Sequence, residues 1–323
     1  KSQGIHCFFP FDIPFIVNSF LKKIKPVACI LLETEIWPNL ITKLKHKNIP
    51  VMLVNARLSK KSFKKYNKFS PKLVSSTLNS LSIICSQNES SSKRFISLGA
   101  NNNIITTGSL KFDSNEPSNS KTIQTLKNIT GNRNIVVFAS TREGEELQII
   151  KSYLALKSKF NALLLIVPRH PERFNEVFNI ANENGLNVKR RSLGDQCKAD
   201  TDILIGDSMG EMMSYYSISD IAFIGGSLSN NGGQNMLEAA SLSKPIIFGP
   251  SLFNFEEISK KLLEDGSAIK IKNANELMKT ISELLLDEEK RKLIGQKART
   301  TFDNNRGAIV KVFEAIAPHI EDI

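Results

Sequence analysis

The stretch IAFIGGSLSNNGGQNMLEAASLSKPIIFGP, residues 221–250, contains one complete strand–loop–helix–strand pattern. Four apolar residues are followed by a glycine-rich loop, then by a helix-like run from Asn235 to Ala240. A second apolar run follows and ends in Gly-Pro. Short, fully apolar runs that alternate with helices are typical of buried parallel strands. The stretch therefore predicts an α/β fold with a parallel sheet.

The same alternation continues along the rest of the chain. Nine short apolar runs end in polar residues or glycine and precede helix-like patterns, at residues 27–32, 51–54, 82–85, 135–139, 162–167, 203–205, 221–224, 245–248 and 268–271. Residues 112–122 are rich in Ser, Asn and Pro, which is typical of a linker between domains. We therefore predict one domain over residues 1–118 and a second over 119–305. A C-terminal helix over 306–323 is predicted to pack back toward the first domain.

The composition is that of an ordinary globular protein. Of the 323 residues, 41% are hydrophobic and 23% are charged, which argues against a disordered chain. No apolar run reaches the roughly 18 residues that a membrane-spanning helix needs. The four cysteines and four histidines are dispersed and include no C-x-x-C pair. We therefore expect buried thiols and no metal site.

The excess positive charge is confined to the first third of the chain. Residues 1–120 contain 17 Lys and Arg against 6 Asp and Glu, whereas the remaining residues contain 26 of each. Part of the excess is a cluster formed by Lys60, Lys61, Lys64, Lys65 and Lys68. Such a cluster either forms a solvated face or attracts an anionic partner, a membrane surface or a nucleic acid. No aromatic platform or nucleic-acid motif accompanies it, which argues against nucleic acid.

Ligands of open α/β sheets bind beyond the carboxyl ends of the strands, so the residues after each apolar run are the candidates for chemistry. The stretch CILLETEIWPNLI, residues 29–41, places Glu33 and Glu35 at such a position. After residues 135–139, Ser140 and Thr141 either cap the next helix or face a phosphate.

Two further strand ends carry residues suited to an anionic ligand. The sequence PRHPER, residues 168–173, places Arg169, His170 and Arg173 in a turn made rigid by two prolines. The glycine-rich loop of residues 225–233 lets a ligand approach the backbone, and Glu238 could accept two hydrogen bonds from a ribose diol. No G-x-G-x-x-G follows the first strand, so a nucleotide-sugar is favoured over a dinucleotide.

Seven motifs, in this order and spacing, resemble those of the 3-deoxy-D-manno-octulosonic acid (Kdo) transferases. They are ETEIWPNL, NARLS, TGSLKFD, STREGEE, PRHPERF, GDSMGE, and GGQNMLEAA with the KPIIFGP and FNF that follow it. The similarity extends from about Phe9 to His319. It implies the GT-B glycosyltransferase fold, which has two Rossmann-like α/β domains and an interdomain cleft, with the N-terminal domain incomplete in this chain.

The resemblance also implies an activity. Members of the family move Kdo from CMP-Kdo to a lipid A precursor in lipopolysaccharide biosynthesis, with inversion of the anomeric centre. They act at the cytoplasmic face of the bacterial inner membrane and use no cofactor or metal. By this resemblance residues 1–118 form the acceptor side and residues 119–305 bind the donor substrate CMP-Kdo. The lysine cluster would then face lipid A phosphates and anionic inner-membrane lipids.

The positions of the motifs assign site residues by the same resemblance. Glu33 and Lys111 match the positions that stabilise the transition state. Contacts with CMP or its phosphate are implied for Pro168, Arg169, Met209, Gly210, Glu211, Asn235, Met236, Leu237, Glu238, Gly226, Ser227, Ser140 and Thr141. Two positions depart from the pattern, because Arg142 and Gln234 stand where the family commonly has His.

The family also carries a general base on an upstream glycine-rich segment, preceded by a membrane anchor. This chain is expected to begin after both, and so to bind CMP but to transfer Kdo weakly or not at all. Two other functions stay open: a GT-B transferase that uses a UDP-sugar, and a non-catalytic basic module at the membrane surface. Nucleobase preference separates the UDP-sugar enzyme from a Kdo transferase.

Overall fold

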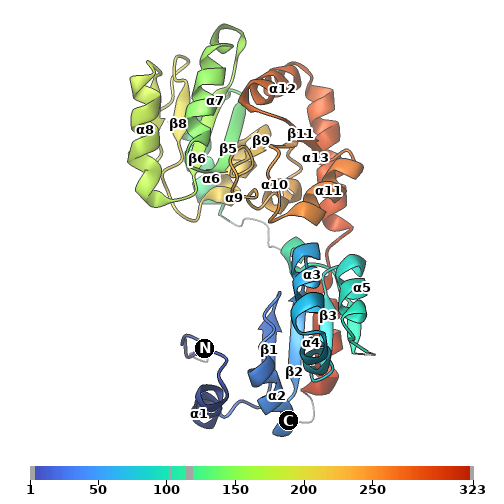
Figure 1. The fold of residues 1–323 in the computed structure, drawn as a ribbon. Coiled ribbons are helices and arrows are strands. Elements are labelled where there is room, and N and C mark those ends of the chain that lie inside the picture. The colour runs from blue at the N-terminus through green and yellow to red at the C-terminus, as the bar shows by residue number, and fades with distance from the viewer. Residues whose placement is uncertain (1–3, 102, 114–118, 321–323) are drawn as a thin grey trace. The chain divides into compact units, whose positions relative to one another are not determined.

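A computed structural model describes residues 4–101, 103–113 and 119–320, and it contains two α/β units (Figure 1). Unit 1 comprises Lys1–Asp113 and Asn305–Ile323, and unit 2 comprises Ser114–Asn304. Each unit has its own parallel sheet and its own apolar core. The predicted α/β class with two Rossmann-like units is thereby confirmed.

The sheet of unit 1 has four parallel strands in the order β1-β2-β3-β4, and these are β1 (Cys29–Leu32), β2 (Val51–Ala56), β3 (Ile83–Ser86) and β4 (Ile104–Thr106). Its helices are α1 (Pro14–Ile24), α2 (Pro38–His46), α3 (Lys60–Phe69), α4 (Pro71–Leu78), α5 (Glu89–Ser97), α14 (Ala308–Ile316) and the 3-10 turns η1 (Leu110–Asp113) and η4 (Ala317–His319). Alternate residues of β2 point to opposite faces, so Val51 and Leu53 join one core cluster and Met52 and Val54 join another.

Helix α14 belongs to unit 1 although it follows all of unit 2 in the chain (Figure 1). It packs on β2 and β3 through an apolar cluster formed by Met52, Val54, Cys85, Val312 and Ile316. The Asp113 carboxylate accepts the backbone N–H groups of Gly307 and Ile309, each at 2.7 Å. A carboxylate at this position satisfies N–H groups that the first turn of a helix leaves unpaired.

The sheet of unit 2 has seven parallel strands in the order β11-β10-β9-β5-β6-β8-β7. They are β5 (Ile135–Thr141), β6 (Leu163–Pro168), β7 (Val188–Arg190), β8 (Ile203–Ile205), β9 (Ile221–Ile224), β10 (Ile246–Phe248) and β11 (Ala268–Lys270). The chain leaves β5 toward β6 and later returns to the other side of β5 at β9. The strand order therefore reverses between β5 and β9, which is where open α/β sheets bind their ligands.

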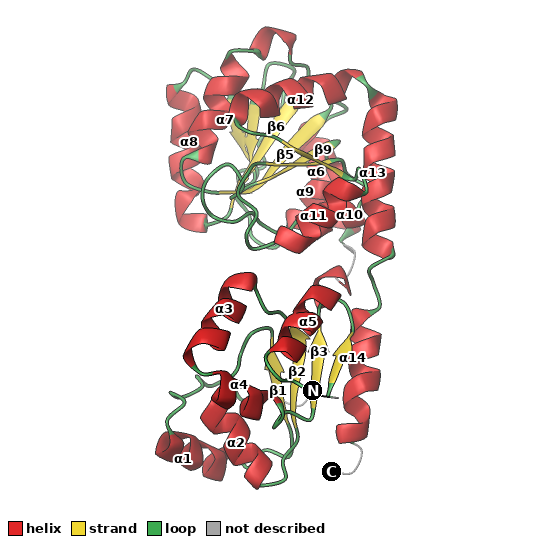
Figure 2. Ribbon diagram, turned by 45° about the vertical axis from the view of Figure 1, so that its right-hand side comes forward, coloured by secondary structure: helices red, strands yellow, loops and turns green. Residues whose placement is uncertain are grey.

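Helices cover both faces of this sheet, as Figure 2 shows. They are α6 (Ser120–Thr130), α7 (Glu145–Leu154), α8 (Phe174–Glu183), α9 (Met212–Ile218), α10 (Leu237–Ser241), α11 (Glu256–Glu264), α12 (Ala274–Leu286) and α13 (Glu288–Asp303), with 3-10 turns η2 (Lys157–Lys159) and η3 (Pro171–Arg173). Helix α7 packs beside α8 and α12, and α10 packs beside α9 and α13. Coverage on both faces is the reason that the central strands are apolar at almost every position.

Each of the nine predicted strands is present, and the structure adds β4 and β7. Both additional strands have three residues and lie at the edge of their sheet. An edge strand has a neighbour on one side only, so it needs no continuous apolar run. The sequence of β7, Val-Lys-Arg, has two basic residues of three and gives no apolar signal.

Candidate active site

A pocket of about 270 Å³ lies at the carboxyl edge of the unit 2 sheet, beside the reversal in strand order. It is lined by Ser140, Val167, Pro168, Arg169, Ser208, Met209, Gly210, Met212, Tyr216, Gln234, Asn235 and Glu238. These residues come from the ends of β5 and β6, the segment after β8, helix α9, the segment that leads into α10, and α10 itself. Seven of the thirteen residues predicted to contact CMP therefore meet at one pocket.

Five lining residues were not among the predicted contacts, namely Val167, Ser208, Met212, Tyr216 and Gln234. The sequence indicates core positions for Val167 and Tyr216, because one is apolar, the other is aromatic, and both lie within regular elements. Both are almost fully buried. Met212 is partly buried at the start of α9, and it also lines the pocket. Position in the fold, rather than residue type, brings these side chains to the pocket.

Glu238 has the electrostatic environment expected of a ligand-binding carboxylate. Burial raises its pKa, while the Asn235 amide and the charge of Arg169 act in the opposite direction. Asn235 Nδ2 donates to Glu238 Oε1 at 2.9 Å, which fixes the carboxylate within the pocket. A partly buried carboxylate held in this way is suited to accept hydroxyl groups of a ligand.

The backbone of the glycine-rich loop is bound by Glu145, whose side chain is fully buried. Its two carboxylate oxygens accept four backbone N–H groups, those of Arg142 (2.9 Å), Gly226 (2.7 Å), Leu228 (2.8 Å) and Ser229 (3.2 Å). A ring of backbone N–H groups normally binds an external anion. Here a carboxylate of the protein occupies that position, so these N–H groups are not available to a phosphate.

The other predicted residues of this loop are part of its internal structure. The Ser227 hydroxyl donates to Ile224 O and accepts the backbone N–H of Gly249, and its side chain is fully buried. Thr141 is also fully buried, and its Oγ1 has no hydrogen-bond partner among the described residues. Gly226, Ser227 and Thr141 are outside the pocket lining. Their place beside a phosphate stays a prediction.

Three further predicted contacts are likewise absent from the pocket lining. Met236 and Leu237 are fully buried at the start of α10. The Glu211 carboxylate accepts from Arg191 at 3.0 Å and from the Ser208 hydroxyl. Glu211 therefore braces the segment that carries Ser208 and Met209, both of which line the pocket.

The two arginines of the PRHPER turn have different environments. Arg169 is exposed and lines the pocket. Arg173 instead forms a two-point ion pair with the fully buried Glu146 of α7, at 2.7 and 3.2 Å, and a further pair with Glu176. These carboxylates raise the pKa of Arg173 above its ordinary value. Arg173 is thus structural, which the sequence pattern did not reveal.

The interpretation of Ser140 or Thr141 as a helix cap is wrong. Helix α7 begins at Glu145, and its N-cap is Gly144, which has φ +82° and makes no side-chain cap. Ser140 instead has φ +55°, a left-handed conformation that is costly for a residue with a side chain. Glu33 and Asn55, at the ends of β1 and β2, share this feature, with φ +61° and φ +51°. Strained residues at strand ends are typical of functional sites.

In unit 1 the structure brings together Glu33 and Lys111. Lys111 Nζ lies 3.7 Å from Glu33 Oε1, and both side chains are partly exposed. Asn55 at the end of β2 holds the turn that carries Lys111, because its Oδ1 accepts the backbone N–H of Leu110 at 3.1 Å. Glu35 accepts from the indole Nε1 of Trp37 at 2.8 Å, and Pro38 is the first residue of α2. Glu35 therefore supports the turn that presents Glu33.

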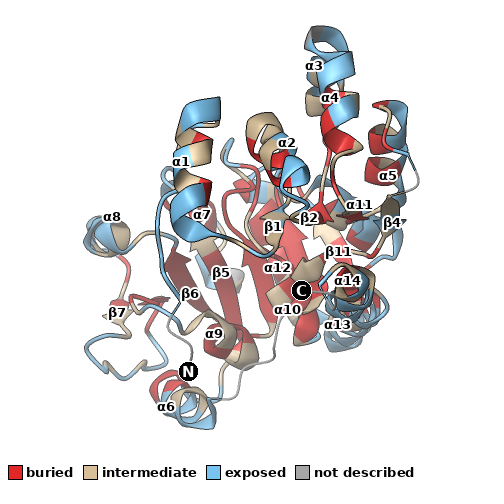
Figure 3. Ribbon diagram, turned by 90° about the horizontal axis from the view of Figure 1, so that it is seen from below, coloured by how far each residue is buried: buried red, intermediate tan, exposed pale blue. Residues whose placement is uncertain are grey.

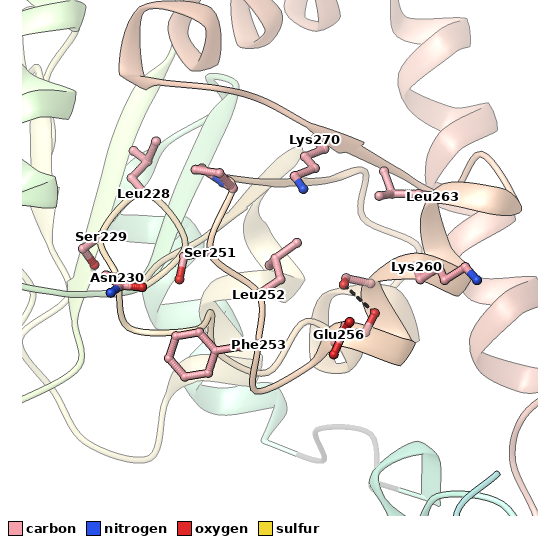
Figure 4. Close-up of a pocket in the computed structure, with 12 residues that line it drawn as sticks. Leu228, Ser229, Asn230, Ser251, Leu252, Phe253, Glu256, Lys260, Leu263 and Lys270 are labelled. Carbon is pink, nitrogen blue, oxygen red and sulfur yellow. Dashed lines mark hydrogen bonds between the residues drawn. The ribbon is translucent and has the colours of Figure 1, made fainter. Parts of the chain in front are cut away.

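A second, larger pocket of about 800 Å³ lies on the β9–β10–β11 side of the same sheet edge (Figure 4). Leu252 and Phe253, with Leu228 and Leu263, make it largely apolar, and Lys260 and Lys270 also line it. None of the predicted site residues lines it. Across residues 4–101, 103–113 and 119–320, no group of three or more His, Cys, Asp or Glu could hold a metal ion. Nor does any helix in these ranges have the length and apolar character needed to cross a membrane.

Comparison with known families indicates a class of protein, the glycosyltransferases. Residues 148–301 match the family described as glycosyl transferases group 1. A glycosyltransferase from Rickettsia africae shares the fold, with a TM-score of 0.62 over 98% of this chain and 84% of that chain, at 15% identity. Such low identity supports the fold alone.

More specific matches identify the family. Residues 1–114 match the family described as 3-deoxy-D-manno-octulosonic-acid transferase (kdotransferase). The 3-deoxy-D-manno-octulosonic acid transferases of Haemophilus influenzae and Bordetella pertussis are 38% and 32% identical to this chain, over 98% of it and over 75% and 74% of their own lengths. The C-terminal CMP-Kdo binding domain of WaaA from Acinetobacter baumannii is 33% identical, with a TM-score of 0.53 over 56% of this chain and 97% of that domain. The chain belongs to the Kdo transferase family.

Proposed function

We propose that this protein transfers Kdo from CMP-Kdo to a lipid A precursor, with inversion of the anomeric centre. The observation that carries the proposal is the pocket of unit 2, which gathers Ser140, Arg169, Met209, Asn235 and Glu238 from separate strand ends. The similarity of unit 2 to a domain described as CMP-Kdo binding supports the same donor. We propose no cofactor and no metal for the transfer.

Within the pocket, the residues have distinct proposed roles. Glu238 accepts the ribose hydroxyls, because its carboxylate is partly buried and oriented by Asn235. Arg169 supplies positive charge close to Glu238, where it offsets the charge of the phosphate. Pro168, Met209 and Gly210 form the walls against which the nucleobase lies. Gly226, Ser227, Thr141, Glu211, Met236 and Leu237 contribute by holding these walls in place.

We further assign transition-state stabilisation to Glu33 and Lys111 of unit 1. A lysine adjacent to a carboxylate keeps its ammonium group oriented before the substrate binds. The ammonium can stabilise negative charge that develops as CMP leaves. Glu33 in turn can hydrogen-bond the donor and keeps Lys111 in place. Under this assignment residues 1–118 carry the acceptor side and residues 119–305 carry the donor side.

Calorimetric titration of CMP, with UMP as the comparison ligand, tests the donor assignment. We expect the whole chain to bind CMP in preference to UMP, and Glu238→Ala to weaken CMP binding at least tenfold, since it removes charge-assisted hydrogen bonds. Glu183→Ala, which removes an exposed carboxylate from α8, is the matched control and should bind as the wild type does. Preference for UMP would overturn the assignment in favour of a UDP-sugar. Melting curves of all three proteins establish that each is folded.

The lysine cluster supports a proposal for the membrane. Lys60, Lys61, Lys64, Lys65 and Lys68 all lie on α3, and all five are exposed. Much of α3 has the colour of exposed residues in Figure 3. The opposite side of α3 is anchored, because Phe63 and Tyr66 pack on the core of unit 1. We propose that this lysine face binds anionic lipids and lipid A phosphates at the cytoplasmic face of the bacterial inner membrane. Each basic residue near such a surface contributes roughly 1 kcal/mol.

Sedimentation with vesicles tests this surface. Alanine at Lys60, Lys61, Lys64 and Lys65 should weaken binding to anionic vesicles by about two to three orders of magnitude at low salt. The matched control removes the same charge from unit 2, by alanine at the exposed residues Lys151, Lys272, Lys279 and Lys290. Equal loss in both variants would show that net charge, and not the α3 face, governs the interaction. Binding that is insensitive to salt and to anionic lipid would contradict the proposal.

A further inference from the structure

Two arginines of unit 2 differ from the others in their partners. Six arginines of this unit donate to a carboxylate or carbonyl oxygen of the protein, and these are Arg133, Arg173, Arg190, Arg191, Arg291 and Arg299. Among the described residues, neither Arg142 nor Arg169 forms an ion pair or a side-chain hydrogen bond to a protein oxygen. Both lie at the carboxyl edge of the sheet, after β5 and after β6.

Arg142 is held in a defined position without being neutralised. Its backbone N–H is bound by the buried Glu145, and its Nη1 donates to Nε2 of His170. A donor at Nε2 requires the ring proton of His170 to be on Nδ1, which lies 3.8 Å from Glu172 Oε1. The Nε–H of Arg142 is buried, and within the described part of the chain it has no hydrogen-bond partner. A buried donor without a partner is costly, so this site is prepared for an acceptor.

Arg142 adjoins the pocket on the side of the glycine-rich loop. A Cβ atom placed on Gly226 would lie 3.1 Å from Gln234 Nε2 and 3.5 Å from Arg142 Cγ. Gln234 and Ser140 both line the pocket, and Ser140 is two residues before Arg142. The Arg142 side chain and the Gln234 amide thus flank Gly226, and a Cβ atom on this glycine would crowd the amide. Both groups are donors, and a guanidinium presents a planar fork that matches a carboxylate.

We propose that Arg142, together with Gln234, binds the carboxylate of an acidic sugar attached to the nucleotide. This inference rests on the proposed function, because it specifies how the same site recognises the sugar of its donor. A CMP-linked keto-acid sugar carries two anionic groups, the phosphodiester and the sugar carboxylate. The two arginines that lack protein oxygen partners match this number. Arg169 lines the pocket and is assigned to the phosphate, which leaves Arg142 for the carboxylate.

Three ligands separate the carboxylate from the phosphate as the source of the anion. Cytidine, CMP and CMP-Kdo are titrated calorimetrically into the wild-type chain, Arg142→Ala and Arg142→Lys. We expect the wild type to bind CMP-Kdo more tightly than CMP. Arg142→Ala should abolish this difference, a loss of about tenfold to a hundredfold for CMP-Kdo, while its affinity for CMP stays within about twofold of the wild type. Arg142→Lys should keep part of the difference, because it retains the charge without the fork.

The matched control is Lys151→Ala, which removes one exposed positive charge from α7. Melting temperatures within a few degrees of the wild type show that each variant is folded. Equal weakening of CMP and CMP-Kdo in Arg142→Ala, with cytidine unaffected, would place the phosphate at Arg142 and overturn the proposal. An unchanged difference between CMP-Kdo and CMP would overturn it too. Failure of the wild type to bind CMP would instead refute the proposed donor, and this inference with it.

Discussion

The buried carboxylate of Glu145 provides a test of what holds the candidate site together. The change Glu145→Gln keeps the size of the side chain and replaces one carboxylate oxygen by an NH₂ group. In the structure one oxygen accepts Gly226 and Arg142, and the other accepts Leu228 and Ser229. Whichever way the amide is turned, its NH₂ group faces two N–H donors. Two of the four hydrogen bonds are therefore lost.

The magnitude follows from the kind of bond that is removed. A hydrogen bond to a charged group contributes roughly 1.5–3 kcal/mol, so two bonds are worth roughly 3–6 kcal/mol. Replacing a buried charge by a neutral amide recovers part of the cost of desolvation, which favours the lower end of this range. We expect a loss of about 3 kcal/mol in the free energy of unfolding of unit 2. For a unit of this size, that corresponds to a fall in Tm of about 6–12 °C.

The assay uses the position of the single tryptophan. Trp37 lies in unit 1, so its fluorescence follows the unfolding of that unit, whereas circular dichroism follows the helices of both units. In Glu145→Gln the transition of unit 2 should move to lower temperature while the Trp37 transition stays in place. The affinity for CMP should also fall at temperatures where unit 2 is folded, because Glu145 holds the loop beside the pocket.

Glu143→Gln is the control, since Glu143 is exposed two residues away and the change removes the same charge. It should leave both transitions within about 1 °C of the wild type. A Glu145→Gln protein with wild-type stability and CMP affinity would refute the reasoning. Such a result would mean that the four N–H groups are satisfied without the carboxylate.

Three other changes have expected outcomes that follow from single features. Burial raises the pKa of Glu238, so this carboxylate is protonated at a higher pH in the folded protein than in the unfolded chain. Protonation of Glu238 therefore stabilises the fold at a pH below the unfolded pKa, and this stabilisation is lost as the pH rises through the folded pKa. Glu238→Gln should therefore make stability less dependent on pH in this range and raise the free energy of unfolding at neutral pH, while it weakens CMP binding. Denaturation at several pH values measures the change in stability. Gly225→Ala places a Cβ 2.5 Å from the backbone oxygen of Ser140, so the free energy of unfolding of unit 2, measured by urea denaturation, should fall by at least about 2 kcal/mol. The control Gly185→Ala has no atom within 4 Å of its Cβ, and its φ of +75° should lower the free energy of unfolding by only about 1 kcal/mol. Asp113→Ala removes both acceptors at the start of α14 and should lower the stability of unit 1 by about 1–2 kcal/mol. The unfolding transition of Trp37 measures this loss, and an unchanged transition would show that apolar packing alone holds the helix.

The buried strands could be predicted from the sequence because burial on both faces leaves a continuous apolar run. This holds for β5, β6 and β9, which are apolar over four or more consecutive residues. It fails for the edge strands β4 and β7, because β4 has only three residues and two of the three residues of β7 are basic. Apolar runs do not indicate the order of the strands in a sheet, so the reversal in strand order between β5 and β9 is known only from the structure.

The candidate site was predictable only in part, for a related reason. Motif positions led to Arg169 and Glu238, and the structure places both at one pocket. The same motifs do not tell a side chain that faces a ligand from one that faces a neighbouring helix. Arg173 is bound by Glu146, and the N–H groups around Gly226 are bound by Glu145. Tyr216 reaches the pocket from within a helix whose pattern indicates only burial.

The position of α14 in the chain has a consequence for the order in which the protein folds during synthesis. Residues 4–113 leave the ribosome before unit 2 and α14, yet the face formed by Met52, Val54 and Cys85 packs against Val312 and Ile316 of α14. Unit 2, residues 114–304, is contiguous and can complete its core before α14 has been made. The unit that begins first therefore finishes last, and until then its apolar face is exposed to chaperones and to other nascent chains.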